Sequence, residues 1–380
     1  MSQDESLRKK KKDSNEFMKR IVLFKTSLLS GGAEHQLVVL AEMLVSIGYS
    51  VTVVTFSDVP DHYSLSDSVE RVRIAPRRSS IIKFISIFKY LLRTPMDVLI
   101  GFGVRENFLI LIPMLFRKGV KVIAGERNAT LTSPSFYERI DHLFLYKRAD
   151  RIVTNSYTQQ SYLRSKYPRW SNKLSTIINY TNVNAYTIQD GVINNSIPQI
   201  GVFARYSEQK NCKRFAEAVY LIKKSVGPCF MVSWFGDILL KGRVSPVYES
   251  FLSLIQEYEI DDVISLHDHI KDVASIINRF DVMCLPSIYE GFSNSLSEYI
   301  CCGKPVLVSD VSDNGLMVKD GFNGFLFNPY DSESIRDAFL RFFSLSNEQR
   351  AIMGHNSRSI AEGLFDRKAY LDSYVSIIES

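Results

Sequence analysis

Two glutamates separated by seven residues, Glu290 and Glu298, have the types and spacing for chemistry on hydroxyl-bearing ligands. The apolar run 282–286 before them predicts a buried strand, and the following residues predict a helix that starts near Ser293 or Ser295. The small polar residues between the glutamates are Ser293, Asn294 and Ser295. Carboxylates accept hydrogen bonds from hydroxyls, and amides at a helix start hold phosphate. The pattern therefore suits a ligand in which a diphosphate joins a sugar to a ribose.

A second interpretation of these residues is purely structural. Ser295 and Glu298 have the spacing of a capping box, in which the glutamate closes the start of its own helix. On spacing alone, both interpretations stay open.

A basic pair follows another expected strand, 200–204. Arg205 and Lys210 are five residues apart. An arginine fork can bind a diphosphate in two places, and a lysine supplies a point charge. Such a pair would stabilise the charge that develops on a leaving diphosphate. A solvated basic pair is the alternative.

Near the start of the chain, a predicted strand at 21–26 runs into Gly31 and Gly32, and a helix follows. Two glycines permit a sharp turn and a close approach to a ligand, and the helix start favours phosphate. The pattern is neither G-x-G-x-x-G nor a P-loop, so neither of those nucleotide sites is expected. A plain turn between a strand and a helix explains the glycines equally well.

Short β-branched runs alternate with helix-period segments along the whole chain of 380 residues. This alternation predicts parallel sheets covered on both faces, and the length favours two domains. Five cysteines without metal spacing favour a reducing compartment, and no apolar run is long enough to span a bilayer. The expected strands are 21–26, 51–56, 72–75, 98–102, 121–124, 151–155, 175–178, 200–204, 231–235, 263–266, 282–286 and 306–309; the expected helices include 33–47, 81–92, 135–148 and 366–378, the last after a break near Gly363.

The charge is divided between the two halves. Residues 1–190 have a net charge of +11 and residues 191–380 a net charge of −6, which suggests two domains with different partners. The sign changes in the polar segment 186–198. The expected divisions are a disordered tail at 1–17, an N-terminal Rossmann-like domain at 18–185, a linker at 186–198, a C-terminal Rossmann-like domain at 199–362, and a C-terminal helical segment at 363–380 that packs back on the N-terminal domain.

The segment 281–328 resembles a known family. Its E-G-F-x(5)-E, C-G-K-P-V and D-G-x-N-G elements are similar to those of the family 4 (group 1) glycosyltransferases, which adopt the GT-B fold of two doubly wound Rossmann-like α/β domains facing a cleft. Tyr299 stands where that family commonly has alanine, and Ala204 and Asn211 replace two glycines that flank the basic pair. No D-x-D occurs, which fits an enzyme that uses no metal.

The resemblance implies a retaining transfer of sugar from a nucleotide-diphosphate sugar to a hydroxyl acceptor, without a further cofactor. Glu290 would orient the donor sugar and Glu298 would bind the ribose, while Arg205 and Lys210 would stabilise the leaving diphosphate. Ser293, Asn294, Ser295, Gly31 and Gly32 would complete the donor site. The resemblance thus implies a nucleotide-sugar-binding domain at 199–362 and an acceptor-binding domain at 18–185. With no carboxylate nucleophile evident, front-face substitution is the expected route, in which the leaving phosphate takes the acceptor proton.

On the acceptor side, the family often has a histidine after the strand that here ends in Glu126 and Arg127, and this chain has none there. Glu126, Arg127 and Arg105 are candidates to contact donor sugar or acceptor, with a structural ion pair as the alternative for the first two.

Residues 71–93 contain seven basic and no acidic side chains, interleaved with apolar ones. They predict a basic amphipathic helix that either lies on an anionic membrane or packs on the sheet. We expect a cytoplasmic enzyme, peripheral on the inner membrane face, that uses a lipid-linked glycan acceptor in lipopolysaccharide or capsule assembly. No nucleic-acid module is evident. The competing hypotheses are a sugar-nucleotide epimerase of the same fold and a non-enzymatic membrane-surface protein.

Overall fold

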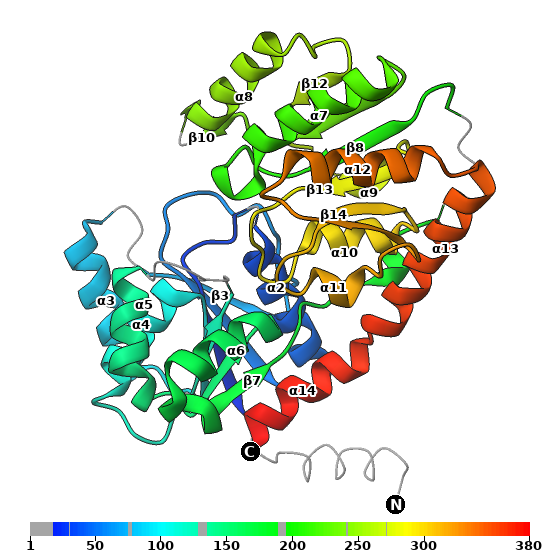
Figure 1. The fold of residues 1–380 in the computed structure, drawn as a ribbon. Coiled ribbons are helices and arrows are strands. Elements are labelled where there is room, and N and C mark those ends of the chain that lie inside the picture. The colour runs from blue at the N-terminus through cyan, green and yellow to red at the C-terminus, as the bar shows by residue number, and fades with distance from the viewer. Residues whose placement is uncertain are drawn as a thin grey trace, which may run out of the picture. The chain divides into compact units, whose positions relative to one another are not determined.

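The computed structural model describes residues 18–29, 31–74, 78–127, 135–188, 195–240, 242–270 and 272–380. They form two compact units (Figure 1). The first contains the described residues up to Ile178 together with Lys368–Ser380, and the second is Asn179–Arg367. The expected tail 1–17 and part of the expected linker, 189–194, lie outside the described residues.

The first unit is built on a parallel sheet with strand order β3-β2-β1-β4-β5-β6-β7. Its strands are β1 (Arg20–Phe24), β2 (Ser50–Thr55), β3 (Glu70–Arg73), β4 (Val98–Phe102), β5 (Lys121–Glu126), β6 (Arg151–Thr154) and β7 (Leu174–Thr176). Its helices are α2 (Gly32–Ser46), α3 (Ser80–Arg93), α4 (Val104–Met114), α5 (Phe136–Leu143), α6 (Tyr157–Lys166) and α14 (Arg367–Glu379), with short 3₁₀ turns at Leu145–Lys147 and Pro168–Lys173.

The second unit repeats this architecture with parallel strand order β12-β9-β8-β13-β14-β15. Its strands are β8 (Gln199–Phe203), β9 (Met231–Phe235), β12 (Ile264–His267), β13 (Val282–Leu285), β14 (Val306–Ser309) and β15 (Gly324–Phe327), with a small antiparallel pair, β10 (Leu239–Leu240) and β11 (Arg243–Val244). Its helices are α7 (Cys212–Val226), α8 (Pro246–Glu257), α9 (Val273–Ile277), α10 (Asn294–Cys301), α11 (Asn314–Met317), α12 (Ser332–Phe343) and α13 (Asn347–Leu364); 3₁₀ turns lie at Val183–Ala185 and Glu208–Lys210.

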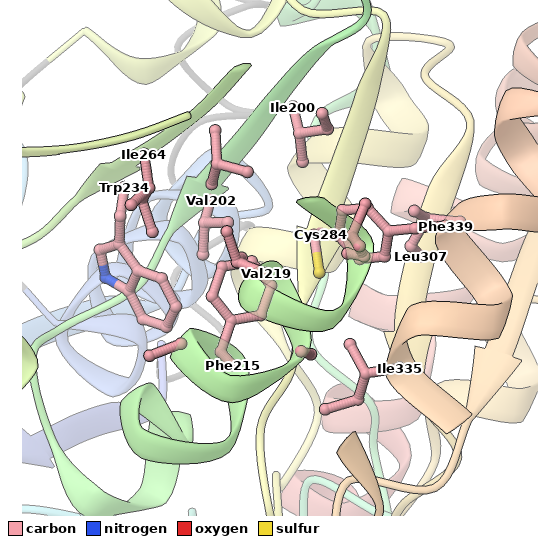
Figure 2. Close-up of a cluster of buried hydrophobic side chains, with 14 of the residues drawn as sticks. Ile200, Val202, Phe215, Val219, Trp234, Ile264, Cys284, Leu307, Ile335 and Phe339 are labelled. Atoms are coloured by element: carbon pink, nitrogen blue, oxygen red, sulfur yellow. The ribbon is translucent and has the colours of Figure 1, made fainter. Parts of the chain in front are cut away.

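Apolar side chains hold the helices of the second unit to its sheet. Figure 2 shows Phe215 and Val219 of α7 beside Trp234 of β9, with Phe339 of α12 in the same cluster. Trp234 is fully buried, and its indole N–H donates to the Ala204 carbonyl at 2.7 Å. This bond satisfies the indole nitrogen inside the core and fixes the chain just after β8.

Both sheets have a point where the strand order reverses, between β1 and β4 in the first unit and between β8 and β13 in the second. Loops that leave neighbouring parallel strands diverge there, so the carboxyl ends of those strands form the ligand-binding edge in open α/β sheets. The structure confirms the prediction of two doubly wound parallel α/β units, and it places the segments after β8 and β13 beside each other.

Several details differ from the sequence predictions. The break expected near Gly363 falls after Leu364, because α13 continues through Gly363, and α14 then starts at Arg367. The helix expected at 135–148 ends as α5 at Leu143 and continues only as a 3₁₀ turn. The first unit ends after Ile178, soon after the last strand of its sheet, rather than at 185. No helix in the described ranges combines the length and the apolar character needed to cross a membrane.

Candidate functional site

The loops after β8 and β13 are joined by backbone and side-chain hydrogen bonds. The Ile288 N–H donates to the Gln209 carbonyl at 2.8 Å, and the Gln209 side-chain amide donates to the Tyr289 carbonyl at 2.9 Å. These bonds bring the Arg205–Lys210 segment to the loop that carries Glu290, although the two are about eighty positions apart in sequence.

Lys210 and Glu290, two of the predicted site residues, form a buried ion pair. The Lys210 ammonium lies 2.5 Å from Glu290 Oε1, with only 11% and 9% of the respective side chains exposed. Ser312 Oγ donates to the Glu290 carbonyl at 2.6 Å and accepts from the Glu290 N–H at 3.1 Å, which holds this backbone in place. Lys210 therefore orients the Glu290 carboxylate, and Ser312 fixes the Glu290 main chain.

Asn211, which replaces a family glycine, has a left-handed backbone with φ of +65°. Asparagine tolerates this conformation better than most residues, so the substitution keeps the turn that places Lys210. The Asn211 side-chain amide also donates to the Pro329 carbonyl at 2.7 Å, a contact that glycine cannot make.

The small polar residues predicted to bind donor lie at the start of α10. Ser293 is the N-cap, and its Oγ accepts from the Leu296 N–H at 3.3 Å. Asn294 accepts a hydrogen bond from Asn179 Nδ2 at 2.8 Å, and Ser295 Oγ donates to the Phe203 carbonyl at 3.1 Å. The first-turn N–H groups of α10 lack intrahelical acceptors, as at any helix start, and they lie in the segment that follows Glu290.

The capping-box interpretation of Glu298 does not agree with the structure. Because Ser293 is the cap, Glu298 lies in the second turn of α10, out of the capping-box position. Desolvation raises the pKa of Glu298 to about 7. The Glu298 carboxyl has this raised pKa and makes no side-chain hydrogen bond to another described residue. It is therefore a candidate to bind a ligand. The neighbouring Tyr299 is buried and its hydroxyl donates to the Phe203 carbonyl at 3.3 Å, so the unusual tyrosine secures the end of β8.

Arg205 follows Ala204 at the end of β8 and is exposed, with no ion pair to another described residue. The second unit thus brings together Arg205, the Lys210–Glu290 pair, the α10 start and Glu298, all predicted from sequence. This assembly can supply a cationic fork, helix-start amides and two carboxylates to one ligand.

In the first unit, Gly31 is the N-cap of α2 and has an extended backbone with φ of −166°, which any residue can adopt. The sharp-turn explanation for Gly31 is therefore wrong. A side chain at Gly31 would instead collide with the carboxylate of Glu34, one turn along the helix that Gly32 begins.

A polar cluster that sequence reasoning missed lies at the switch point of this sheet. The Lys25 ammonium lies 3.5 Å from both Glu34 and Glu106 carboxylates. Glu106 also accepts from the Thr26 N–H at 2.9 Å. Lys25 directly follows β1. In the sequence, only this single charged residue at the end of a strand could have indicated the cluster. Lys25 offsets the negative charge of the two carboxylates beside the α2 start.

Glu126, a predicted acceptor contact, is fully buried, and its Oε1 accepts from the Tyr146 hydroxyl and lies 2.9 Å from His142 Nε2. Burial first, and then Glu126 and Glu138, raise the pKa of the adjacent Asp141 to about 9, so this carboxyl is protonated at neutral pH. Glu126 was expected to contact the acceptor. Because its carboxylate is buried and bonded to Tyr146 and His142, it instead supports the structure of the first unit.

Arg127 is also buried, stacks over the Phe102 ring at 4.5 Å and donates to the Tyr374 hydroxyl of α14. These contacts give Arg127 a structural role, but they are not the ion pair considered for it, because Arg127 forms no ion pair with another described residue. Arg105 is exposed, with its guanidinium 5.5 Å from the Phe56 ring centre, and remains a candidate acceptor contact.

With this geometry established, comparison with known proteins identifies the family. Residues 187–360 match the model described as "Glycosyl transferases group 1", and residues 30–184 match "Glycosyltransferase Family 4". The chain belongs to the group 1 (family 4) glycosyltransferases, as the resemblance implied.

Individual relatives have more specific names. An Escherichia coli UDP-Gal:alpha-D-GlcNAc-diphosphoundecaprenol alpha-1,3-galactosyltransferase is 31% identical over 35% of this chain and 33% of its own length. A Campylobacter jejuni N-acetylgalactosamine-N,N'-diacetylbacillosaminyl-diphospho-undecaprenol 4-alpha-N-acetylgalactosaminyltransferase is 22% identical over 77% of this chain and 81% of its own length. The first relatives are thus matched over a third or less of their own length.

Solved structures agree on the fold. Sucrose-phosphate synthase from Thermosynechococcus elongatus superposes with a TM-score of 0.81 at 16% identity, covering 95% of this chain and 98% of that one. Anabaena Alr3699/HepE in complex with UDP and glucose gives 0.78 at 17% identity, covering 95% and 99%. At these identities the likeness establishes the GT-B fold.

Proposed function

We propose that this protein transfers a sugar from a nucleotide-diphosphate sugar to a hydroxyl of a lipid-linked glycan acceptor, with retention of anomeric configuration. The observation that carries the proposal is the buried Lys210–Glu290 pair at the β8/β13 switch point, next to exposed Arg205 and the α10 start. Membership of the group 1 glycosyltransferases and the UDP named in the Anabaena complex support a nucleotide-sugar donor.

In the proposed reaction, the acceptor oxygen forms a bond to the anomeric carbon as the bond from that carbon to the leaving phosphate oxygen breaks. Both events occur on the same face, and the acceptor proton passes to the leaving phosphate. Glu290 accepts hydrogen bonds from donor-sugar hydroxyls, and Glu298 accepts them from the ribose. Arg205 and the first-turn amides of α10 stabilise the charge that develops on the diphosphate. The proposal involves no metal ion and no further cofactor.

The proposed acceptor is a glycan on a lipid carrier, used in cell-surface polysaccharide assembly at the inner face of the cytoplasmic membrane. Two relatives are named for diphosphoundecaprenol acceptors. The surface of α3 supports this proposal, because Ile81 is 73% exposed and Ile82 and Ile85 are also exposed on a helix that carries lysine and arginine. An exposed apolar stripe with basic flanks is typical of a helix that lies on an anionic membrane.

The test begins with thermal-shift screening against UDP, GDP, ADP and CMP, followed by turnover with sugars of the nucleotide that stabilises the protein. Arg205→Ala and Glu298→Ala should each lose most transfer while remaining folded. Arg279→Ala, at an exposed arginine of the second unit that has no ion pair among the described residues, serves as the matched control. Nuclear magnetic resonance of the product reports its anomeric configuration. Donor conversion without acceptor would favour an epimerase, and full transfer by both variants would refute the site assignment.

A further inference from the structure

The first unit contains a basic pocket of about 620 Å³ that the proposed transfer chemistry does not use. Its lining includes Arg117, Lys118, Lys121, Arg148 and Arg151, against a single acidic residue, Asp150. Lys121 and Arg151 are the first residues of β5 and β6. The pocket therefore lies at the amino-terminal edge of the sheet, whereas Gly31 and Lys25 lie at its carboxyl-terminal edge.

Two of these cations are committed to the fold. The Arg117 guanidinium caps the end of α3 by donating to the Leu91 and Thr94 carbonyls at 2.5 and 2.8 Å. Arg148 donates to the Met114 and Val120 carbonyls at 2.6 and 2.9 Å, and to Asp150 at 3.3 Å. They contribute positive charge and a fixed frame rather than free donors.

The other three cations line the pocket, and they outnumber the nearby carboxylates, which are those of Asp150 and Glu379. Lys121 donates to the Ile378 carbonyl and to Ser380 Oγ, both at 3.3 Å. Arg151 donates to the Asp150 carbonyl at 3.2 Å and to Ser380 Oγ at 3.4 Å, so both cations bond neutral oxygens, and Lys118 is exposed. Burial and the nearby charges of Arg151 and Lys19 lower the pKa of Lys121. An anion that binds between such crowded cations lowers their electrostatic free energy.

The rim of the pocket is apolar on one side. Leu115 is exposed, and Phe116 is 74% exposed, at the end of α4. The Phe116 ring lies 6.0 Å from Phe88 of α3, so the rim continues the exposed apolar surface of that helix. A soluble phosphate ester would explain the basic residues, but it would leave these large exposed apolar side chains without a function.

We propose that this pocket binds the phosphate of an anionic phospholipid headgroup, while Leu115 and Phe116 insert among the adjacent acyl chains. This inference rests on the membrane association included in the proposed function, and it adds the ligand class and its site. Lys118, Lys121 and Arg151 donate hydrogen bonds to the phosphate oxygens.

The test is sedimentation of the full chain with phosphatidylcholine vesicles that contain or lack phosphatidylglycerol. We expect binding to depend on phosphatidylglycerol and to fall about tenfold in Lys118→Gln/Arg151→Gln. The control Arg164→Gln/Lys166→Gln changes the charge equally at two exposed residues of α6 and should bind as the parent does. Lys118→Gln alone should show a smaller loss, and thermal melts verify folding.

Calorimetric titration with inorganic phosphate and glycerol 3-phosphate separates a lipid from a soluble ligand. If the double variant loses binding of these anions but keeps full vesicle binding, the lipid assignment is wrong. Equal vesicle binding by parent, pocket variant and control, or no dependence on phosphatidylglycerol, also overturns it. Sedimentation requires no donor, so failure of the proposed sugar transfer is recognised separately, by turnover with a soluble acceptor.

Discussion

The Lys210→Met substitution tests whether the ion pair at the switch point holds a buried carboxylate. The two side chains are 11% and 9% exposed and lie 2.5 Å apart. Methionine keeps the stem of the side chain and removes the ammonium, which leaves the buried Glu290 carboxyl without its counter-charge. Breaking a buried pair by removing one member typically costs about 3–5 kcal/mol. For a unit of this size, that corresponds to a fall of about 10 °C in its melting temperature.

The double substitution Lys210→Met/Glu290→Gln removes both charges while nearly preserving shape. Because a neutral amide needs no counter-charge, we expect the double variant to recover all but about 1–2 kcal/mol of the loss. Differential scanning calorimetry is the appropriate measurement, since two units need not unfold in one transition. The fluorescence of Trp234, buried in the core of the second unit, helps assign the transition that moves.

Two outcomes would refute this reasoning. A single variant as stable as the parent would mean that Glu290 needs no partner. A double variant no more stable than the single one would mean that the loss comes from packing rather than charge. Transfer supplies a separate criterion, because the stable double variant should remain inactive if Glu290 binds the donor sugar. Recovery of transfer together with stability would make the pair structural.

Three further predictions concern the neighbouring residues. Desolvation raises the pKa of Glu298 from 4.5 to about 7, so between these pH values the folded protein binds more protons than the unfolded chain. The free energy of unfolding should therefore fall by at most about 3 kcal/mol as pH rises through this range. Glu298→Gln should flatten this pH dependence in urea titrations, and an unchanged slope would contradict the prediction. At the left-handed position, Asn211→Gly should melt within a few degrees of the parent, whereas Asn211→Val should lose about 2 kcal/mol more. Ser293→Ala removes the α10 cap and should cost about 1 kcal/mol in chemical unfolding.

Much of the fold was predictable because its strands are local sequence features. The apolar β-branched runs at Val98–Phe102, Met231–Phe235 and Val306–Ser309 form strands at the predicted residues. Buried parallel strands are continuous apolar runs, and their alternation with helices restricts the topology to doubly wound sheets. The edge strand Gly324–Phe327 was missed, because its sequence lies in a glycine- and asparagine-rich motif that indicates a turn.

The candidate site was partly predictable for a related reason. Arg205 directly follows one predicted strand and Glu290 lies in the loop after another, so a parallel sheet must bring them to one edge. The cluster of Lys25 with Glu106 could not be found in this way, because it joins isolated charges at the end of β1 and in the first turn of α4, neither of which carries a motif. The burial of Glu126 likewise depends on Tyr146, which sequence spacing does not connect to it.

The geometry also changes the electrostatic account of the second unit, whose half of the sequence has a net charge of −6. Sequence spacing assigned Arg205 and Lys210 the same role, the neutralisation of a diphosphate. In the structure, the Lys210 charge is balanced by Glu290, so this pair presents no net charge to an approaching anion. The positive potential must then come from Arg205, which is exposed and has no ion pair within the described residues, and from the start of α10. Relative to the parent, Arg205→Ala should therefore reduce affinity for the nucleoside diphosphate more than the double substitution Lys210→Met/Glu290→Gln does. The double variant loses a pair that has no net charge. Equal losses, measured by calorimetric titration of the nucleotide, would show that Lys210 leaves Glu290 to bind the phosphate directly.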